Sequence, residues 1–172
     1  HFLDDALMLA DNVLILQHGV QQQFSPTQEA YWAPSNLFVA QYFGDNNLLM
    51  AIPGTKDKQV VETALGQIKL EHNYQLETSK EVILMCRPHL CNVSTEHNTL
   101  ASVDSQRWKM ILKKISFFGA YQHLEFYHQH RSWWVDVAAK PWREGSTNSN
   151  FLIDEEYWVE VPNSAWSILK SY

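Results

Sequence analysis

Residues 108–117 read WKMILKKISF, and this stretch decides the fold class. Within it, Ile111-Leu112-Lys113-Lys114-Ile115 mixes apolar and charged side chains in a way that suits a strand with one buried and one wetted face. Other short segments of strand character are punctuated by Gly, Asn and Pro at roughly the 8–12-residue spacing of small sandwiches and barrels. The larger, C-terminal part of the chain is therefore predicted to be all-β. Strands are expected over 59–63, 66–70, 82–86, 108–117, 124–127, 133–137 and 157–161.

The first 44 residues have a different texture, because apolar side chains recur there at helical spacing. Asp45-Asn46-Asn47 then forms a polar break, which is the predicted boundary between residues 1–46 and residues 47–172. The elements expected before this break are a helix over 3–10, strands over 12–16 and 20–24 that turn at His18-Gly19, a helix from Thr27 that ends at Pro34, and a helix capped by Ser35 and stopped by Gly44.

The composition is that of an ordinary soluble globular protein, with 45% hydrophobic and 19% charged residues. The formal net charge of -6 gives no overall positive field for a nucleic-acid backbone. The N-terminus lacks the basic region of a signal peptide, and no run approaches the roughly 18 apolar residues of a membrane span. The two cysteines, Cys86 and Cys91, are interpreted as reduced thiols near a strand end, which favours the cytosol.

Three motifs in the first 48 residues keep a fixed order and spacing. They are His1 with Asp5-Ala6 and Leu9-Ala10-Asp11; Gly19 with Gln23, Glu29 and Tyr31; and Pro34 with Phe38-Val39-Ala40, Tyr42, Gly44 and Asn47-Leu48. In this order they resemble the end of the nucleotide-binding domain in the ATP-binding subunits of ABC importers for sugars, ferric iron, polyamines and sulfate. Asp45 after Gly44, followed by Asn47-Leu48, is most similar to the ferric-iron group.

The resemblance implies a mainly β fold with two parts. Residues 1–46 would be the end of the nucleotide-binding domain, a short α+β tail. Residues 47–172 would be the family's regulatory TOBE domain, a small β-barrel related to oligonucleotide-binding (OB) folds. Arg87-Pro88 and Phe117-Phe118-Gly119 stand after predicted strands, where the family often has Arg-Pro-Glu and an aromatic-x-Gly.

Several positions depart from the family pattern, and one of them bears on catalysis. Because Phe2 stands beside His1, the intact subunit is expected to hydrolyse ATP less efficiently than members with Asp at this position. The departures are Phe2 for Asp, Asp5 for Glu, Ser25 for Gly, Thr27 for Pro, and His89 for the Glu after Arg-Pro.

ATP hydrolysis in this family needs a Gly-rich phosphate loop with its Lys, an acidic Mg²⁺ ligand and a catalytic Glu. The sequence contains no Gly-x-x-x-x-Gly-Lys. These 172 residues are therefore predicted not to hydrolyse ATP alone and to need no cofactor, whereas the intact subunit would use ATP and Mg²⁺. Because the chain begins at His1 rather than Met, it is expected to be a fragment, and the resemblance implies that it is the C-terminal part of the subunit.

His1 is the one candidate catalytic residue. The resemblance makes it the switch-loop histidine, which contacts the γ-phosphate and helps to orient the attacking water in the intact subunit. Imidazole suits that task because it hydrogen-bonds both phosphate oxygen and backbone. The alternative is a frayed terminal residue or the remnant of a tag.

Two further clusters invite other kinds of chemistry. His123, His128, His130 and Glu125 suggest a Zn²⁺ site, but 123 and 125 have the opposite parity to 128 and 130, and a solvated hairpin turn around Gln129 is preferred. The second cluster is aromatic and could be a stacking platform for nucleic-acid bases. Packing in the core or at an interface is the preferred interpretation of these residues. The platform's members would be Trp133, Trp134, Trp142 and Tyr121, with Arg131, Lys140 and Arg143 as the basic residues.

The predicted function is the C-terminal, regulatory part of an ATP-binding subunit that couples ATP hydrolysis to uptake of a solute, with ferric iron favoured. The expected partners are a second copy of the chain and membrane-spanning permease subunits, without nucleic acid. The expected location is cytoplasmic, on the inner face of the plasma membrane. The alternatives are an autonomous OB-like module for an oxyanion or nucleic acid, and a small metalloprotein. In a lone fragment, Phe38, Val39 and Phe43 are expected to be exposed and to favour self-association.

Overall fold

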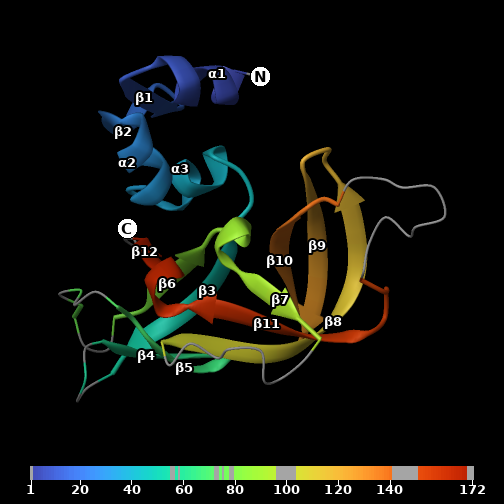
Figure 1. The fold of residues 1–172 in the computed structure, drawn as a ribbon. Coiled ribbons are helices and arrows are strands. Elements are labelled where there is room, and N and C mark those ends of the chain that lie inside the picture. Colours follow the sequence, from blue (N-terminus) through green and yellow to red (C-terminus); the bar gives the residue numbers. More distant parts are fainter. Residues whose placement is uncertain are drawn as a thin grey trace. The chain divides into compact units, whose positions relative to one another are not determined.

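The computed structural model describes residues 2–54, 57, 59–71, 74, 76–77, 80–95, 104–140 and 151–169 (Figure 1). Strands dominate these residues. The chain divides into two compact units, which are described separately. Unit 1 comprises residues 1–85 and 166–172, and unit 2 comprises residues 86–165.

Unit 1 begins with a helical lead-in that contains one hairpin. Its small core contains Ile15, Ala30, Val39 and Phe43, with other apolar side chains of the lead-in packed around them. The turn between the two strands is His18-Gly19, and both of its residues have positive φ angles, as tight hairpin turns of the I′ type require. The elements are α1 (Phe2–Leu9), β1 (Asn12–Gln17), β2 (Val20–Pro26), α2 (Thr27–Trp32) and α3 (Leu37–Tyr42).

The ends of α3 are closed by two asparagines. Asn36 is the N-cap, because its side-chain oxygen accepts a hydrogen bond from the backbone N–H of Val39 at 3.0 Å. The prediction that Ser35 caps this helix is wrong: its hydroxyl instead donates to the carbonyl of Gln22. At the other end Gly44 takes a φ of 109°, as predicted, and the Asn46 amide donates to the carbonyls of Ala40 and Gly44.

The rest of unit 1 is a five-stranded sheet in the order β12-β6-β3-β4-β5. One face is buried throughout and carries side chains such as Leu49, Val61, Ile68 and Leu84. Next to α3, Ala40 packs with Met85 and Leu169. The strands are β3 (Asn47–Pro53), β4 (Val60–Thr63), β5 (Gly66–Lys69), β6 (Val82–Cys86) and β12 (Ser167–Leu169).

Unit 2 is a second five-stranded antiparallel sheet, in the order β10-β9-β8-β11-β7. The buried face alternates as expected for strands, with Leu112 opposite Phe126 and Leu124 opposite Val135. A bulge between Leu112 and Lys114 shifts the register of β8. The elements are the 3₁₀ turn η1 (Pro88–Leu90), β7 (Asn92–Ser94), β8 (Ser105–Phe117), β9 (Tyr121–His128), β10 (Arg131–Ala138), β11 (Glu156–Pro162) and the 3₁₀ turn η2 (Asn163–Ala165).

Each of the nine predicted strands, two in the lead-in and seven after it, is confirmed to within a few residues, but β3, β7 and β12 were not predicted. β3 was missed because its first residue, Asn47, was assigned to the polar break. The predicted boundary between the nucleotide-binding and regulatory domains, at residues 46/47, falls inside unit 1. It stays a prediction. The predicted loop over 143–150 lies outside the described residues. Within the described part of the chain, no helix is both long and apolar enough to cross a membrane.

Candidate functional site

In unit 1, Gln23 of the family motif lies in a partly buried polar network. The side-chain oxygen of Gln23 accepts a hydrogen bond from the backbone N–H of Ser35 at 2.7 Å, and its amide donates to the hydroxyl of Ser25 at 2.9 Å. The neighbouring Gln22 accepts from the Asn36 amide through its own side-chain oxygen. Gln23 therefore fastens β2 to the segment that starts α3. His1 lies outside the described residues, so its predicted catalytic role stays a prediction.

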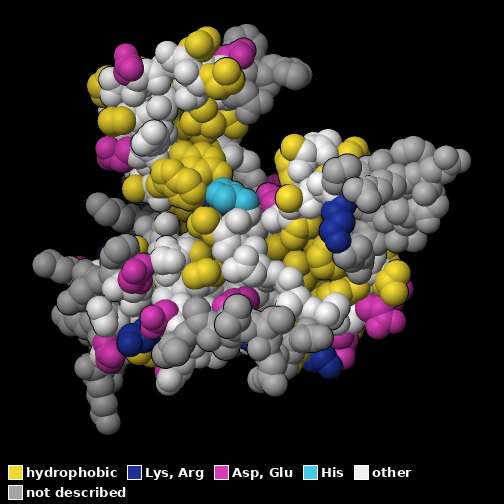
Figure 2. All heavy atoms as spheres, viewed as in Figure 1, with side chains coloured by type: hydrophobic (Ala, Val, Ile, Leu, Met, Phe, Trp, Pro, Cys, Tyr) yellow, Lys and Arg dark blue, Asp and Glu magenta, His cyan; other side chains and the backbone are white. Residues whose placement is uncertain are grey.

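The outward face of the β1–β2 hairpin is apolar. Leu14 and Phe24 are directly opposite each other on the two strands, and Leu16 lies farther along β1; all three are more than half exposed. In Figure 2, hydrophobic side chains gather on the surface of the lead-in. This hairpin thus presents an uncovered apolar face to solvent.

The prediction that Phe38, Val39 and Phe43 would be exposed is wrong. Val39 is fully buried and Phe43 nearly so, and Phe38 is partly buried against the same cluster. These side chains close the core of the lead-in itself, because α2 and α3 fold back onto the hairpin. The exposed apolar residues lie instead on the opposite side of the strands.

In unit 2, the outer face of β9 and β10 carries a histidine–carboxylate pair. Asp136 lies opposite His123, and the carboxylate Oδ1 is 2.6 Å from the imidazole Nδ1. The His123 ring also stacks on Trp134 and meets Phe118 edge-on. Because these contacts orient the ring and satisfy Nδ1, His123 is held in one position on the sheet.

The turn that carries Arg87 and His89 packs against β10. The Arg87 side chain is buried, at 1% exposure. Partial burial lowers the pKa of His89, and the nearby Arg87 guanidinium lowers it further, whereas Asp136 acts in the opposite direction. Arg87, His89, His123 and Asp136 therefore form one polar cluster at the edge of unit 2.

The structure does not bring the proposed zinc ligands together. His123 and Glu125 lie on one face of β9, and His128 lies on the other. His130 sits in the turn, where Gln129 and His130 both have positive φ, so the predicted turn around Gln129 is confirmed. Among the described residues, no group of three or more His, Cys, Asp and Glu could hold a metal ion.

The aromatic residues also divide between the two faces. Trp133 is buried and its ring centroid lies 6.0 Å from that of Trp108, so the preferred interpretation of core packing is confirmed for this residue. Its neighbour Trp134 points the other way and stacks on His123. Tyr121 stacks on Phe118 at the end of the β8–β9 hairpin. Of the remaining members, Trp142 and Arg143 lie outside the described residues.

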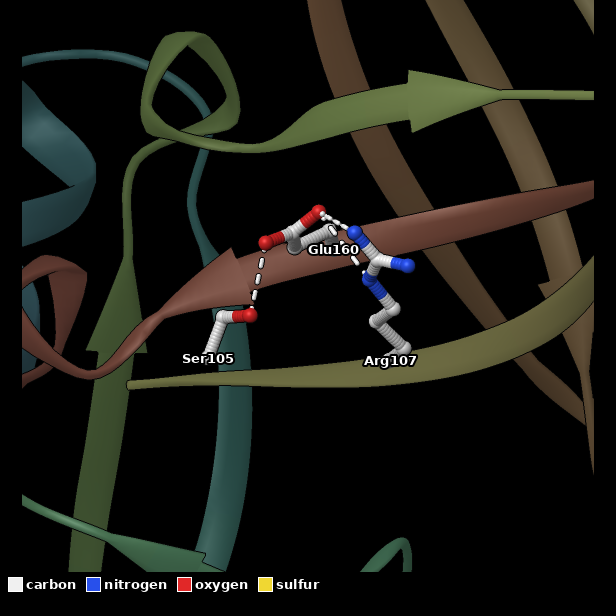
Figure 3. Close-up of polar contacts among 3 residues, drawn as sticks. All are labelled: Ser105, Arg107 and Glu160. Atoms are coloured by element: carbon white, nitrogen blue, oxygen red, sulfur yellow. Dashed lines mark hydrogen bonds and ion pairs between the residues drawn. The ribbon is translucent and has the colours of Figure 1, made fainter. Parts of the chain in front are cut away.

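Figure 3 shows a nearly buried ion pair between β8 and β11. The Arg107 guanidinium donates to Oε2 of Glu160 from Nη2 at 2.7 Å and from Nε at 3.1 Å. The other carboxylate oxygen of Glu160 accepts from the Ser105 hydroxyl at 2.6 Å. Exposure of the two charged side chains is only 11% and 14%. Glu160 thus joins two positions of β8 on one face of the sheet.

Asp136, Glu160 and the contact between the two cysteines were not predicted from the sequence. Cross-strand partners depend on register, which the sequence did not give for these strands. Alternation along 133–137 was a usable signal for Asp136, because it places an acidic residue on the face opposite the buried Trp133 and Val135.

No protein-family model matches the chain. The "Spermidine/putrescine import ATP-binding protein PotA" of Hahella chejuensis is 23% identical over 174 residues, which covers 99% of this chain and 46% of that protein. The "Fe(3+) ions import ATP-binding protein FbpC" of Haemophilus influenzae is 24% identical over 82% of this chain and 38% of its own length. PotA of Methylococcus capsulatus is 29% identical over 51% of this chain and 24% of its own length. The chain thus spans less than half of each of these relatives.

Among solved structures, the cytoplasmic molybdate-binding protein ModG, with molybdate bound, superimposes with a TM-score of 0.57. The match covers 73% of this chain and 96% of ModG at 10% sequence identity, so it concerns the fold alone. It confirms the prediction of a mainly β, OB-like fold of the TOBE type. Over much of its length, the chain is similar in sequence to the ATP-binding subunits of ABC importers.

Proposed function

We propose that the chain is the C-terminal, regulatory part of the ATP-binding subunit of an ABC importer. The similarity to import ATP-binding proteins, which runs through nearly the whole chain, carries this proposal. It includes the helical lead-in as well as the β strands. An autonomous OB-like module for an oxyanion or nucleic acid is not favoured for that reason.

In this proposal residues 1–46 complete the nucleotide-binding domain and residues 47–172 form the regulatory domain. The apolar outer face of the β1–β2 hairpin supports the division, because a surface of this kind suits packing against the preceding part of a larger domain. The intact subunit would bind ATP and Mg²⁺ and pair with a second copy. It would act on the cytoplasmic face of the plasma membrane with membrane-spanning permease subunits.

Ferric iron is the proposed solute. Asp45 after Gly44 and the following Asn47-Leu48 are similar to the ferric-iron group, and an iron importer subunit is among the relatives. Polyamine and sulfate importer subunits are also relatives. Uptake of radiolabelled ferric iron, spermidine and sulfate by cells with and without the gene distinguishes the three, and loss of iron uptake alone is expected.

ATPase assays on the gene product extended upstream of His1 test the proposed activity. His1→Ala is expected to lower kcat by about two orders of magnitude, because the transition state loses a hydrogen-bonding partner of the γ-phosphate. His18→Asn is the matched control, since this exposed turn residue has positive φ, which Asn tolerates. Equal rates for His1→Ala and the parent protein would rule out the switch role.

A further inference from the structure

Two cysteines bracket the turn that carries Arg87 and His89. Cys86 ends β6, and Cys91 directly follows η1. Their Sγ atoms lie 3.6 Å apart, and neither cysteine is in a disulfide bond. Cys86 is fully buried and Cys91 is 4% exposed. Neither residue has a part in the function proposed above.

Backbone hydrogen bonds hold the two thiols in this arrangement. The N–H of Leu90 donates to the carbonyl of Arg87 at 3.0 Å, and the N–H of Cys91 donates to the carbonyl of Pro88 at 3.2 Å. Both sulfur atoms also lie within hydrogen-bonding range of the Arg87 carbonyl, at 3.5 and 3.9 Å. The turn therefore presents each sulfur to the other rather than to separate pockets.

We propose that Cys86 and Cys91 are a peroxide-sensitive pair that closes into a reversible disulfide and locks the turn over residues 87–90. An S–S bond is about 2.0 Å long, so the sulfurs must approach by roughly 1.6 Å from their present contact. Rotation about the two Cα–Cβ bonds supplies such a movement without a change of strand pairing. The short sequence separation keeps both residues on the same turn throughout.

We assign the first step to Cys91, because its exposure of 4% is the larger of the two. The Cys91 thiolate attacks hydrogen peroxide, the O–O bond breaks, and Cys91 becomes a sulfenic acid while hydroxide leaves and takes up a proton. The sulfur of Cys86 then attacks the sulfenic sulfur, the S–O bond breaks, and the departing hydroxide takes the Cys86 proton as water. Two thiols are oxidised to one disulfide, and one peroxide is reduced to two waters.

The surroundings of Cys86 agree with its place as the second cysteine. Its hydrogen bond with Cys91 and its burial raise the pKa of its thiol well above the usual range. Cys86 therefore stays protonated near neutral pH and reacts poorly with free peroxide. Its attack depends on a sulfenic acid already formed next to it.

Peptide mass spectrometry of the 172-residue chain tests the pair directly. The native chain is treated with hydrogen peroxide, unfolded, and alkylated without reductant. Trypsin cuts after Lys80 and Arg107 and not before Pro88, so both cysteines stay in one peptide, 81–107. The expected product has lost two hydrogen atoms, takes up no alkyl group, and regains both alkylation sites after reduction. Fragment ions separate this product from oxidation of Met85.

Single substitutions assign the steps, and alanine avoids placing a hydroxyl in the buried site. In Cys86→Ala, Cys91 is expected to gain oxygen atoms, since the resolving thiol is absent. In Cys91→Ala, Cys86 is expected to remain an alkylatable thiol. Amide exchange at Leu90 and Cys91 should slow on oxidation of the parent chain. Oxygen uptake without bridging, or resistance of both thiols while the urea-unfolded chain reacts, would overturn the proposal.

Discussion

The β1–β2 hairpin of unit 1 and the β8–β11 pair of unit 2 each have one face outside the apolar core, but different side chains cover these two faces. The hairpin exposes Leu14, Leu16 and Phe24. On the outer side of β8 and β11, charged side chains pair across the strands. Arg107 with Glu160 and Lys109 with Glu156 join the two strands, and Lys113 pairs with Asp154 in the turn before β11.

The difference indicates which surface is complete. A sheet face covered by paired charges is stable in water as it stands. An apolar hairpin face gains free energy only when another surface covers it. We therefore expect the outer face of β8 and β11 to need no covering partner. We expect the hairpin face to be one side of an interface. The variants below test this contrast.

Glu160→Gln should have the largest effect, a loss of about 2 kcal/mol in the unfolding free energy of unit 2. The change removes the negative charge that receives two guanidinium hydrogen bonds and leaves Arg107 nearly buried beside a neutral amide. Urea unfolding followed by Trp fluorescence measures it.

Glu156→Gln is the matched control for that variant. The Lys109–Glu156 pair joins the same two strands, but its side chains are 51% and 53% exposed. Solvent screening limits such a pair to less than about 0.5 kcal/mol. Equal losses for the two variants would show that burial does not decide the strength of these pairs.

Gln23→Ala should destabilise the lead-in by about 1.5 kcal/mol, because the backbone N–H of Ser35 and the Ser25 hydroxyl lose their shared partner. Amide exchange at Ser35 and Val39 is the local readout, and both should exchange faster. Gln21→Ala, on an exposed position of the same strand, should leave exchange unchanged. Protection of Ser35 in Gln23→Ala would contradict the assigned role.

The triple variant Leu14→Ser, Leu16→Ser, Phe24→Ser should change stability by less than about 0.5 kcal/mol at each site, since these side chains are largely exposed. Its main effect should be weaker self-association in sedimentation velocity, because the apolar face is lost. Ile15→Ser, on the opposite face of the same strand, should instead unfold the lead-in. Unchanged self-association in the triple variant would mean that the hairpin face does not drive association.

His89→Asn should have the smallest effect, on pH dependence alone. The folded pKa of His89 lies below its ordinary value of 6.5, so the unfolded chain binds the proton more tightly. The parent chain should therefore lose stability as the pH falls from about 6.5 through the lowered pKa, and the variant should lose less. Thermal unfolding at a series of pH values checks this, and parallel curves would contradict it.

Much of the fold was predictable because its strands alternate or end at clear turn residues. His18-Gly19 marked the first hairpin and Gly44 marked the end of α3. β3 was missed because its polar start resembles a linker. Its apolar residues carry no sequence pattern that distinguishes a strand from another buried segment. β12, of three residues, is too short for a pattern.

The polar clusters were less predictable than the strands. His123 and His128 were predicted from the sequence as possible metal ligands. The register places them on opposite faces of β9, and His123 contacts Asp136 instead. The Cys86–Cys91 contact depends on a 3₁₀ turn that propensity alone does not indicate. Such pairings arise from tertiary geometry, which a single sequence encodes only through register and turn shape.

The DNA sequence immediately upstream of the His1 codon tests the central claim most directly. The account predicts an open frame that encodes Gly-x-x-x-x-Gly-Lys-Ser/Thr and, farther along, a strand ending in acidic residues. The same frame should supply the apolar surface that covers Leu14 and Phe24. A start codon directly before His1 would contradict the account, because the chain would then be an autonomous β-module without a phosphate loop.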